Sequence, residues 1–148
     1  MRVALLSAAL SLGLAACSQP AEAPPPAKAE PRALAGVDLD QPVRALGTEP
    51  FWAVEITPQT LIYSGVDRSE QKAANPGPTL QGTVATWKAR TEAGADLAVT
   101  LTATDCSDGM SDRTYPLTAK VEIAGETLTG CAAASAAVER AGASGRVE

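Results

Sequence analysis

In two stretches of the chain every second residue is apolar: DLAVTLTA at residues 96–103 and YPLTAKVEI at residues 115–123. In the first stretch, Leu97, Val99 and Leu101 fall on one face, and alanine and threonine residues fall between them. A side-chain period of two is typical of a β-strand with one face buried and the other in water. Both stretches are therefore predicted to be strands, and they decide the fold class.

The rest of the chain also carries strand and turn signals. The Ala124-Gly125 pair suits a tight two-residue turn and predicts a hairpin with the following ETLTGC, residues 126–131. The polar segment 66–82 is expected to be a long loop with one edge strand. Further strands are expected at residues 51–57, 60–63 and 82–90. Together these patterns predict an all-β domain, a small antiparallel β-barrel or sandwich of about six to eight strands.

The chain begins with MRVALLSAALSLGLAAC, one arginine followed by a largely apolar run that ends at Cys17. The run is shorter than the ~20 apolar residues of a membrane-spanning helix, and its layout is that of a secretory signal peptide. Because the cysteine directly follows Leu14-Ala15-Ala16, the segment resembles the bacterial lipobox, in which the cysteine becomes the lipidated N-terminus. Residues 1–16 are therefore predicted to be a lipoprotein signal peptide, with an ordinary secretory signal as the alternative.

Composition divides the remaining chain into a folded part and two flanking segments. The segment 17–40 is rich in proline and alanine and has little to bury, so it is predicted to be a tether that starts at the lipidated cysteine. Residues 41–131 are predicted to form the β-domain, and the small residues of 132–148 a flexible tail. Ser18 follows the lipidated cysteine where an aspartate would favour the inner membrane. We therefore expect a lipid-anchored protein on the periplasmic face of the outer membrane.

Three cysteines and the absence of histidine limit the chemistry of the chain. With Cys17 assigned to the lipid, Cys106 and Cys131 remain, and two thiols in a secreted domain most often form a disulfide. Closing a loop of about 26 residues would stabilise the domain by roughly 3.5 kcal/mol. The net charge of −5 argues against binding to nucleic acid, which needs a basic surface. Neither a metal nor another cofactor is expected.

The first candidate functional segment is ALGTEPFW, residues 45–52. Glu49 lies on a bend between a glycine and a proline, and the aromatic residues Phe51 and Trp52 follow it. A carboxyl group beside aromatic side chains can have a raised pKa and act as a general acid. The structural interpretation is that Trp52 fills the core while Glu49 pairs with an arginine.

The second candidate is CSDGMSDRTYP, residues 106–116, the densest group of polar side chains in the chain. Asp108 and Asp112, together with the preceding Asp105, invite a calcium interpretation, but these three aspartates lack the spacing of an EF-hand loop. The structural interpretation is that Asp108 and Asp112 accept backbone hydrogen bonds within a turn. Arg113 lies where the chain re-enters a strand and is predicted to bind the carboxylate of Glu49 through its two-pronged guanidinium.

Three strings, in this order, resemble the signature of a family of bacterial predicted lipoproteins of unknown function. They are GTEPFW at residues 47–52, CSDGMSDRTYP at 106–116 and GETLTGC at 125–131. The resemblance covers residues 45–131 and implies an envelope lipoprotein, without an established activity. A weaker similarity links the chain to small β-barrel envelope lipoproteins such as the inhibitors of c-type lysozyme, whose Tyr-x-Cys signature this sequence does not contain.

Because the sequence offers no catalytic constellation, the expected function is non-enzymatic. We expect a binding or inhibitor module for an envelope protein or cell-wall component, attached to the membrane through the lipid on Cys17. One alternative is a hydrolase in which Glu49 acts with Asp108 or Asp112, and another is a structural or stress-associated envelope lipoprotein. The surface expected to carry function consists of Glu49, Phe51, Trp52, Asp108, Asp112, Arg113 and Tyr115.

Overall fold

The structure is a computed structural model, and it describes residues 32–148. The predicted signal peptide 1–16, the predicted lipidation site Cys17 and the first part of the predicted tether lie outside the described residues.

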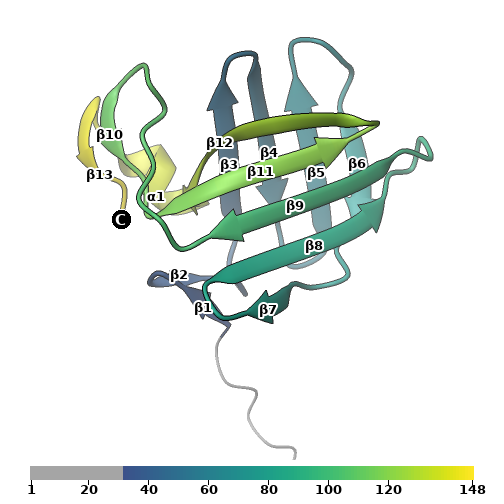
Figure 1. Ribbon diagram of the computed structural model, residues 1–148, viewed down its shortest axis with the longest axis horizontal. Coiled ribbons are helices and arrows are strands. Elements are labelled where there is room, and N and C mark those ends of the chain that lie inside the picture. The colour runs from purple at the N-terminus through teal and green to yellow at the C-terminus, as the bar shows by residue number, and fades with distance from the viewer. Residues whose placement is uncertain (1–31) are drawn as a thin grey trace, which may run out of the picture.

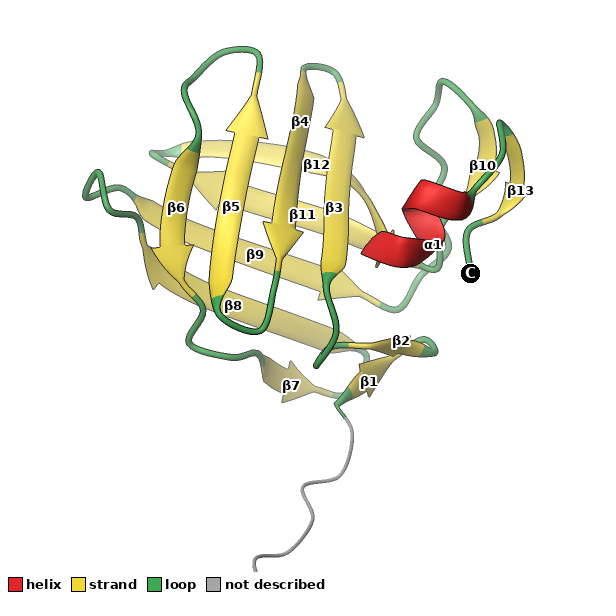
Figure 2. Ribbon diagram, turned by 180° about the vertical axis from the view of Figure 1, so that it is seen from behind, coloured by secondary structure: helices red, strands yellow, loops and turns green. Residues whose placement is uncertain are grey.

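A single nine-stranded antiparallel sheet makes up most of the protein and curls into a half-barrel (Figures 1 and 2). The end of β8 (Val84–Arg90) approaches the edge strand β6 (Gln71–Ala74), where the Glu92 N–H donates to the Lys72 carbonyl at 2.8 Å. Across the sheet the strands are β6 (Gln71–Ala74), β5 (Thr60–Gly65), β4 (Phe51–Ile56), β3 (Val43–Thr48), β12 (Glu126–Ala134), β11 (Leu117–Ile123), β9 (Asp96–Thr102), β8 (Val84–Arg90) and β7 (Thr79–Gln81).

The expected all-β fold is confirmed, and the strongest predictions correspond to observed strands. The two stretches with an apolar residue at every second position form β9 and β11, which pair with each other, and the Ala124-Gly125 turn joins β11 to β12. The sheet has nine strands rather than six to eight because the predicted long loop 66–82 contributes both β6 and β7, and because β3 was not predicted.

The concave face of the half-barrel holds the main hydrophobic core. Alternate residues of every long strand point into it, and burying each large apolar side chain contributes about 1.5–3 kcal/mol. The largest fully buried side chains of this core are Trp87, Tyr63, Ile56, Leu61, Leu97, Leu101, Leu117 and Ile123.

Strand β12 connects the two halves of the sheet, and we call the part where its partner changes from β11 to β3 the corner. The strand pairs with β11 through residues 126–132 and with β3 through Cys131–Ala134. Because side chains alternate along the strand, Leu128 and Ala132 face the main core, and Cys131 faces outward.

The folded domain extends beyond both of its predicted boundaries. Before residue 41, β1 (Ala33–Leu34) and β2 (Val37–Asp38) form a small hairpin. Leu34, Val37 and Leu39 are buried in the main core. The last residues of the predicted tether are therefore part of the domain, because these three apolar side chains have a place in its core.

The predicted flexible tail 132–148 is packed against the outside of the sheet. It consists of the end of β12, the six-residue helix α1 (Ser135–Arg140) and β13 (Ser144–Arg146), which pairs in parallel with β10 (Asp112–Thr114). Ala137 and Val147 are 3% and 1% exposed. The expectation of a flexible tail is wrong because its small residues fit closely over β3 and β12. Within residues 32–148 no helix is long and apolar enough to cross a membrane.

Candidate functional site

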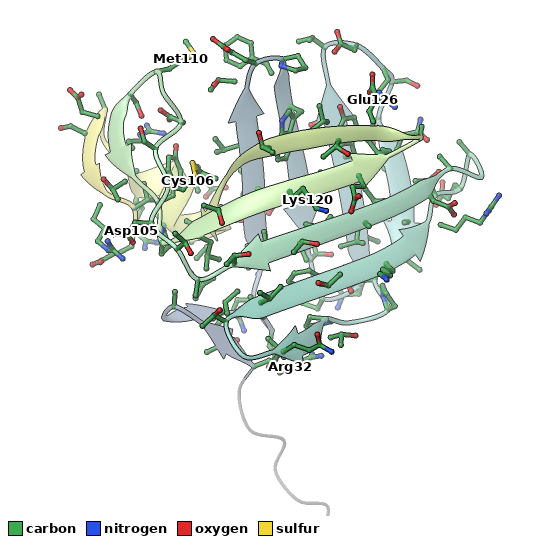
Figure 3. The ribbon with its side chains drawn as sticks, viewed as in Figure 1. Arg32, Asp105, Cys106, Met110, Lys120 and Glu126 are labelled. Carbon is green, nitrogen blue, oxygen red and sulfur yellow. A yellow bond between two sulfur atoms is a disulfide. The ribbon has the colours of Figure 1, made fainter. Side chains whose placement is uncertain are left out.

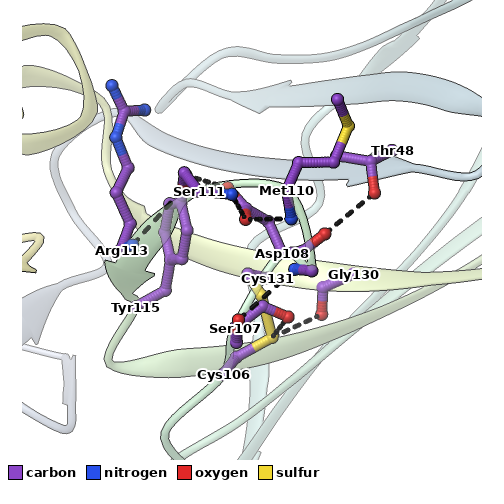
Figure 4. The surroundings of a disulfide bond; sticks show 11 residues. Thr48, Cys106, Ser107, Asp108, Met110, Ser111, Arg113, Tyr115, Gly130 and Cys131 are labelled. Atoms are coloured by element: carbon purple, nitrogen blue, oxygen red, sulfur yellow. Dashed lines mark hydrogen bonds between the residues drawn. A yellow bond between two sulfur atoms is a disulfide. The ribbon is translucent and has the colours of Figure 1, made fainter. Parts of the chain in front are cut away.

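A second, smaller core lies on the outer face of β3 and β12, and the disulfide is part of it (Figure 4). The predicted bond between Cys106 and Cys131 is present, with a Cα–Cα distance of 5.5 Å. Cys131 is fully buried, and Tyr115 packs in the same cluster with 1% of its surface exposed. Cys106 and Tyr115 also exchange two backbone hydrogen bonds, at 2.9 and 2.8 Å. The base of the 106–116 segment is thereby fixed to the sheet.

The carboxylate of Asp108 organises the loop above this base. Its Oδ1 accepts hydrogen bonds from the backbone N–H groups of Met110 (3.0 Å) and Ser111 (2.8 Å). Its Oδ2 accepts from the Ser111 hydroxyl (2.7 Å) and the Tyr115 hydroxyl (3.2 Å). The predicted role of Asp108 as an acceptor within the turn is therefore observed, whereas Asp112 is exposed and its side chain accepts no hydrogen bond from residues 32–148.

The same bonds determine how Asp108 ionises. Partial burial raises the pKa of Asp108, but the hydrogen bonds from Ser111, Met110 and Tyr115 together outweigh it and hold the pKa below its ordinary value. The group is thus anionic at neutral pH, and all of its strong acceptor positions are engaged.

Replacing Asp108 with Asn should lower the free energy of unfolding by about 1–2 kcal/mol at pH 7, because charge-assisted hydrogen bonds become neutral ones. Since the folded-state pKa is depressed, the stabilisation is present above the unfolded pKa of about 3.9 and is lost as pH falls through the folded pKa. Urea denaturation at pH 7 and pH 3 measures both effects. The control is Asp112→Asn on the same loop, and equal stability of the two variants at pH 7 would contradict the role of Asp108.

The two candidate segments lie side by side at one end of the half-barrel. The GTEPFW segment forms the tip of the β3–β4 hairpin, where Thr48 pairs with Phe51 and a cis bond joins Glu49 to Pro50. The Thr48 hydroxyl donates to the Asp108 carbonyl at 2.9 Å, which joins the hairpin to the 106–116 loop (Figure 4).

Trp52 stands behind this contact and is 4% exposed, so its predicted core role is correct. Its indole lies against Gly47, the residue opposite it on β3, and against Gly130 on β12. A Cβ atom at Gly130 would lie 2.8 Å from the Leu46 carbonyl carbon and 2.9 Å from Cζ2 of Trp52. Such distances are too short for carbon contacts, so glycine is required where these chains meet.

Arg113 does not bind Glu49, and that prediction is wrong. Its Nε donates to the Gly142 carbonyl at 2.6 Å and its Nη2 to the Ala141 carbonyl at 3.2 Å. The guanidinium therefore holds the C-terminal segment against the loop. Glu49 is exposed at the hairpin tip and makes no ion pair within residues 32–148.

A polar groove of about 790 Å³ opens between the two segments and continues over the outer face of the sheet. The hairpin contributes Thr48 and Glu49, and the 106–116 loop contributes Ser107, Asp108 and Met110. Its floor is formed by side chains of β9, β11 and β12, namely Thr100, Thr102, Thr118, Lys120 and Thr129.

Three residues of the groove floor, Thr100, Lys120 and Thr129, belong to a row of polar side chains that crosses five strands. Successive cross-strand pairs place Thr79, Thr86, Thr100, Lys120 and Thr129 in line on β7, β8, β9, β11 and β12. Neighbouring members of such a row are about 4.8 Å apart. Figure 3 shows Lys120 on the strand face in front of the half-barrel. The protein thus presents regularly spaced hydroxyl groups beside the two candidate segments.

The site offers little for acid–base or metal chemistry. A general acid at neutral pH needs a raised pKa, whereas that of Asp108 is lowered. Asp112 is not among the residues that line the groove. Asp105 pairs with Arg146 at 3.1 Å, so the three aspartates of the calcium interpretation have separate partners and surroundings. Across residues 32–148, no three acidic or thiol side chains are grouped so that they could hold a metal ion.

The structure brings most of the expected surface together. Glu49, Phe51, Asp108 and Arg113 lie at the same end, with Trp52 and Tyr115 buried beneath them. Sequence reasoning missed the threonines of the floor, because each is an ordinary outward residue of its own strand. Only the register between strands shows that Thr100 and Thr129 lie in one row and that Thr102 and Thr118 lie opposite each other.

Comparison of the chain with protein-family models, with curated proteins and with solved structures found no match in any of the three.

Proposed function

We propose that the protein is a lipid-anchored binding module of the bacterial cell envelope, held on the periplasmic face of the outer membrane through Cys17. Its ligand is an envelope protein or a cell-wall component that occupies the polar groove. The lipobox-like leader, the predicted tether and the resemblance to bacterial lipoproteins support the location.

The observation that carries this proposal is the groove between the two candidate segments. One wall is fixed by the disulfide and by the four hydrogen bonds to Asp108, and the other is joined to it through Thr48. A rigid site loses little entropy when it binds, which favours affinity. The hydroxyl groups of the floor both donate and accept hydrogen bonds, as a ligand rich in hydroxyl or amide groups requires.

The hydrolase alternative receives less support. In a carboxylate pair, the partner of the acid must activate a water or attack the substrate through its own oxygen atoms. Both carboxylate oxygens of Asp108, the partner of Glu49 along the groove, already accept hydrogen bonds from Met110, Ser111 and Tyr115. A binding role uses the same groove without requiring either carboxyl group to exchange a proton.

Photo-crosslinking in living cells tests the binding role. A benzophenone side chain is introduced into the full-length chain at Thr129 in the groove or, as a control, at Ala93 in the exposed β8–β9 turn. We expect a discrete adduct from position 129 and none from position 93. The absence of any adduct at 129 would favour a structural envelope protein.

In the same cells, Cys17→Ser should move the protein from the membrane fraction to the soluble fraction.

A further inference from the structure

Three apolar side chains are exposed on neighbouring loops at one end of the half-barrel. Phe51 follows the β3–β4 turn, Val66 follows β5 and Met110 belongs to the 106–116 loop, and their exposed fractions are 55%, 69% and 67%. We call these three residues the loop-end patch. Of the large hydrophobic side chains exposed within residues 32–148, the only other is Leu80 on β7. Exposed apolar side chains are therefore concentrated at this end.

The loops that carry the patch contact one another. The Val66 N–H donates to the Phe51 carbonyl at 3.2 Å, and a hollow of about 490 Å³ is bordered by Phe51, Val66 and Asp108. Met110 adjoins the hairpin from the other side, because it lines the polar groove together with Glu49. Figures 1 and 2 show the three loops at the same end of the half-barrel in opposite views.

An acidic residue accompanies each member of the patch. Glu49 lies two residues from Phe51, Asp67 follows Val66, and Asp112 lies two residues from Met110. All three acids are exposed, and none forms an ion pair within residues 32–148. The patch thus has an acidic rim.

The positive charges of the arginines near the patch do not neutralise this rim. Arg44 pairs with Glu55 at 3.7 Å, and Arg68 pairs with Glu126. Arg113 lines the hollow beside Phe51 and Val66 and donates only to backbone carbonyls, so it brings one positive charge against the three acids of the rim. The rim therefore carries a surplus of negative charge.

The patch also lies far from the point where the described chain begins. Figure 3 places Met110 and Arg32 at opposite ends of the molecule. Beyond Arg32 the chain leads to the predicted lipid on Cys17. An acidic surface is repelled by anionic lipid headgroups, so both its position and its charge favour a protein partner over a membrane.

We propose that the loop-end patch docks a protein whose surface has an apolar pocket surrounded by lysine and arginine side chains. The inference rests on the proposed binding function and names the chemistry of one partner. Phe51 and Met110 act as anchors that enter the pocket, since a few large side chains carry most of the binding energy at such interfaces. Glu49 and Asp67 meet the basic rim and accelerate association through electrostatic attraction.

The test introduces the benzophenone side chain at Val66 of the full-length chain in its own bacterium, with position 80 on β7 as the control. We expect a protein adduct from position 66 and none from position 80. The adduct should disappear in Phe51→Ser/Met110→Ser and weaken strongly in Glu49→Gln/Asp67→Asn. It should persist in Glu92→Gln/Glu139→Gln, which removes the same charge from exposed acids elsewhere in the domain.

The captured protein, once identified by mass spectrometry and purified, is titrated with the same variants. We expect its affinity to fall at least tenfold in Glu49→Gln/Asp67→Asn, with a slower association rate and a weaker dependence on salt. Crosslinks to lipid, or a protein adduct that survives both patch variants, would overturn the inference. If position 129 yields an adduct and position 66 does not, the binding function stands and this inference fails; if neither yields one, both fail.

Discussion

Gly130→Ala should lower the free energy of unfolding by about 3 kcal/mol, the upper part of the range for overpacking a rigid interior. The new methyl group would overlap the Leu46 carbonyl and press on the indole of Trp52. Neither neighbour can move freely, because Leu46 is paired with Cys131 in the sheet and Trp52 is 4% exposed in the main core. Urea denaturation of the mature protein measures the loss as a lower midpoint at an unchanged slope.

Gly142→Ala is the matched control for this substitution. An added Cβ at Gly142 meets no atom within 4 Å, and this glycine does not have a positive φ. Its variant should therefore remain within about 0.5 kcal/mol of the parent protein. If Gly130→Ala left the free energy of unfolding as little changed as Gly142→Ala, the corner of β12 would have space for a methyl group, and the close approach described above would be incorrect.

The close approach at Gly130 gives a physical reason for one glycine in each of the GTEPFW and GETLTGC segments. Gly47 begins GTEPFW and Gly130 precedes the cysteine of GETLTGC, and both lie against the Trp52 indole. These residues hold the β3–β4 hairpin against β12. They therefore position Glu49 and Thr48 beside the polar groove without contacting a ligand themselves.

The sequence predicts best the strands whose apolar residues recur regularly. β9 and β11 carry apolar residues at every second position, and most of these residues are large, so the sequence alone predicts which face of each strand is buried. β3 was missed because its inward residues are Val43, Ala45 and Gly47, which become smaller toward the corner. Small residues are needed there because Trp52 occupies the space, and this requirement is invisible until the strands are paired.

The sequence also mispredicted the two ends of the domain and the partner of Arg113. In both cases the residues involved show no distinctive pattern in the sequence. Ala132, Ala133 and Ala137 are buried, yet an alanine-rich segment carries no strong apolar period. Arg113 was matched with Glu49 through complementary charge, whereas its actual partners are two uncharged backbone carbonyls. Backbone acceptors occur at every residue, so sequence alone cannot single out those at Ala141 and Gly142.

Loss of the Cys106–Cys131 bond should lower the free energy of unfolding by about 3.5 kcal/mol, because the unfolded chain regains the entropy of a 25-residue loop. That is a large fraction of the 5–15 kcal/mol that stabilises a typical domain. The Cys106→Ala/Cys131→Ala variant should therefore unfold at a much lower urea concentration than the parent protein. The packing of the 106–116 segment should loosen before that of the main core. The bond lies in the small outer core with Tyr115, whereas the main core contains neither cysteine.

Hydrogen exchange distinguishes local from global loosening. In the double variant, the amides of residues 106–116 should exchange much faster than in the parent protein. The amides in the centres of β9 and β11 should remain protected and exchange only when the whole domain unfolds. Adding reductant to the parent protein should reproduce the variant's denaturation midpoint, and adding it to the variant should change nothing. Uniformly faster exchange throughout the sheet would show instead that the outer core supports the entire half-barrel. In that case the disulfide would stabilise the fold as a whole rather than the wall of the groove.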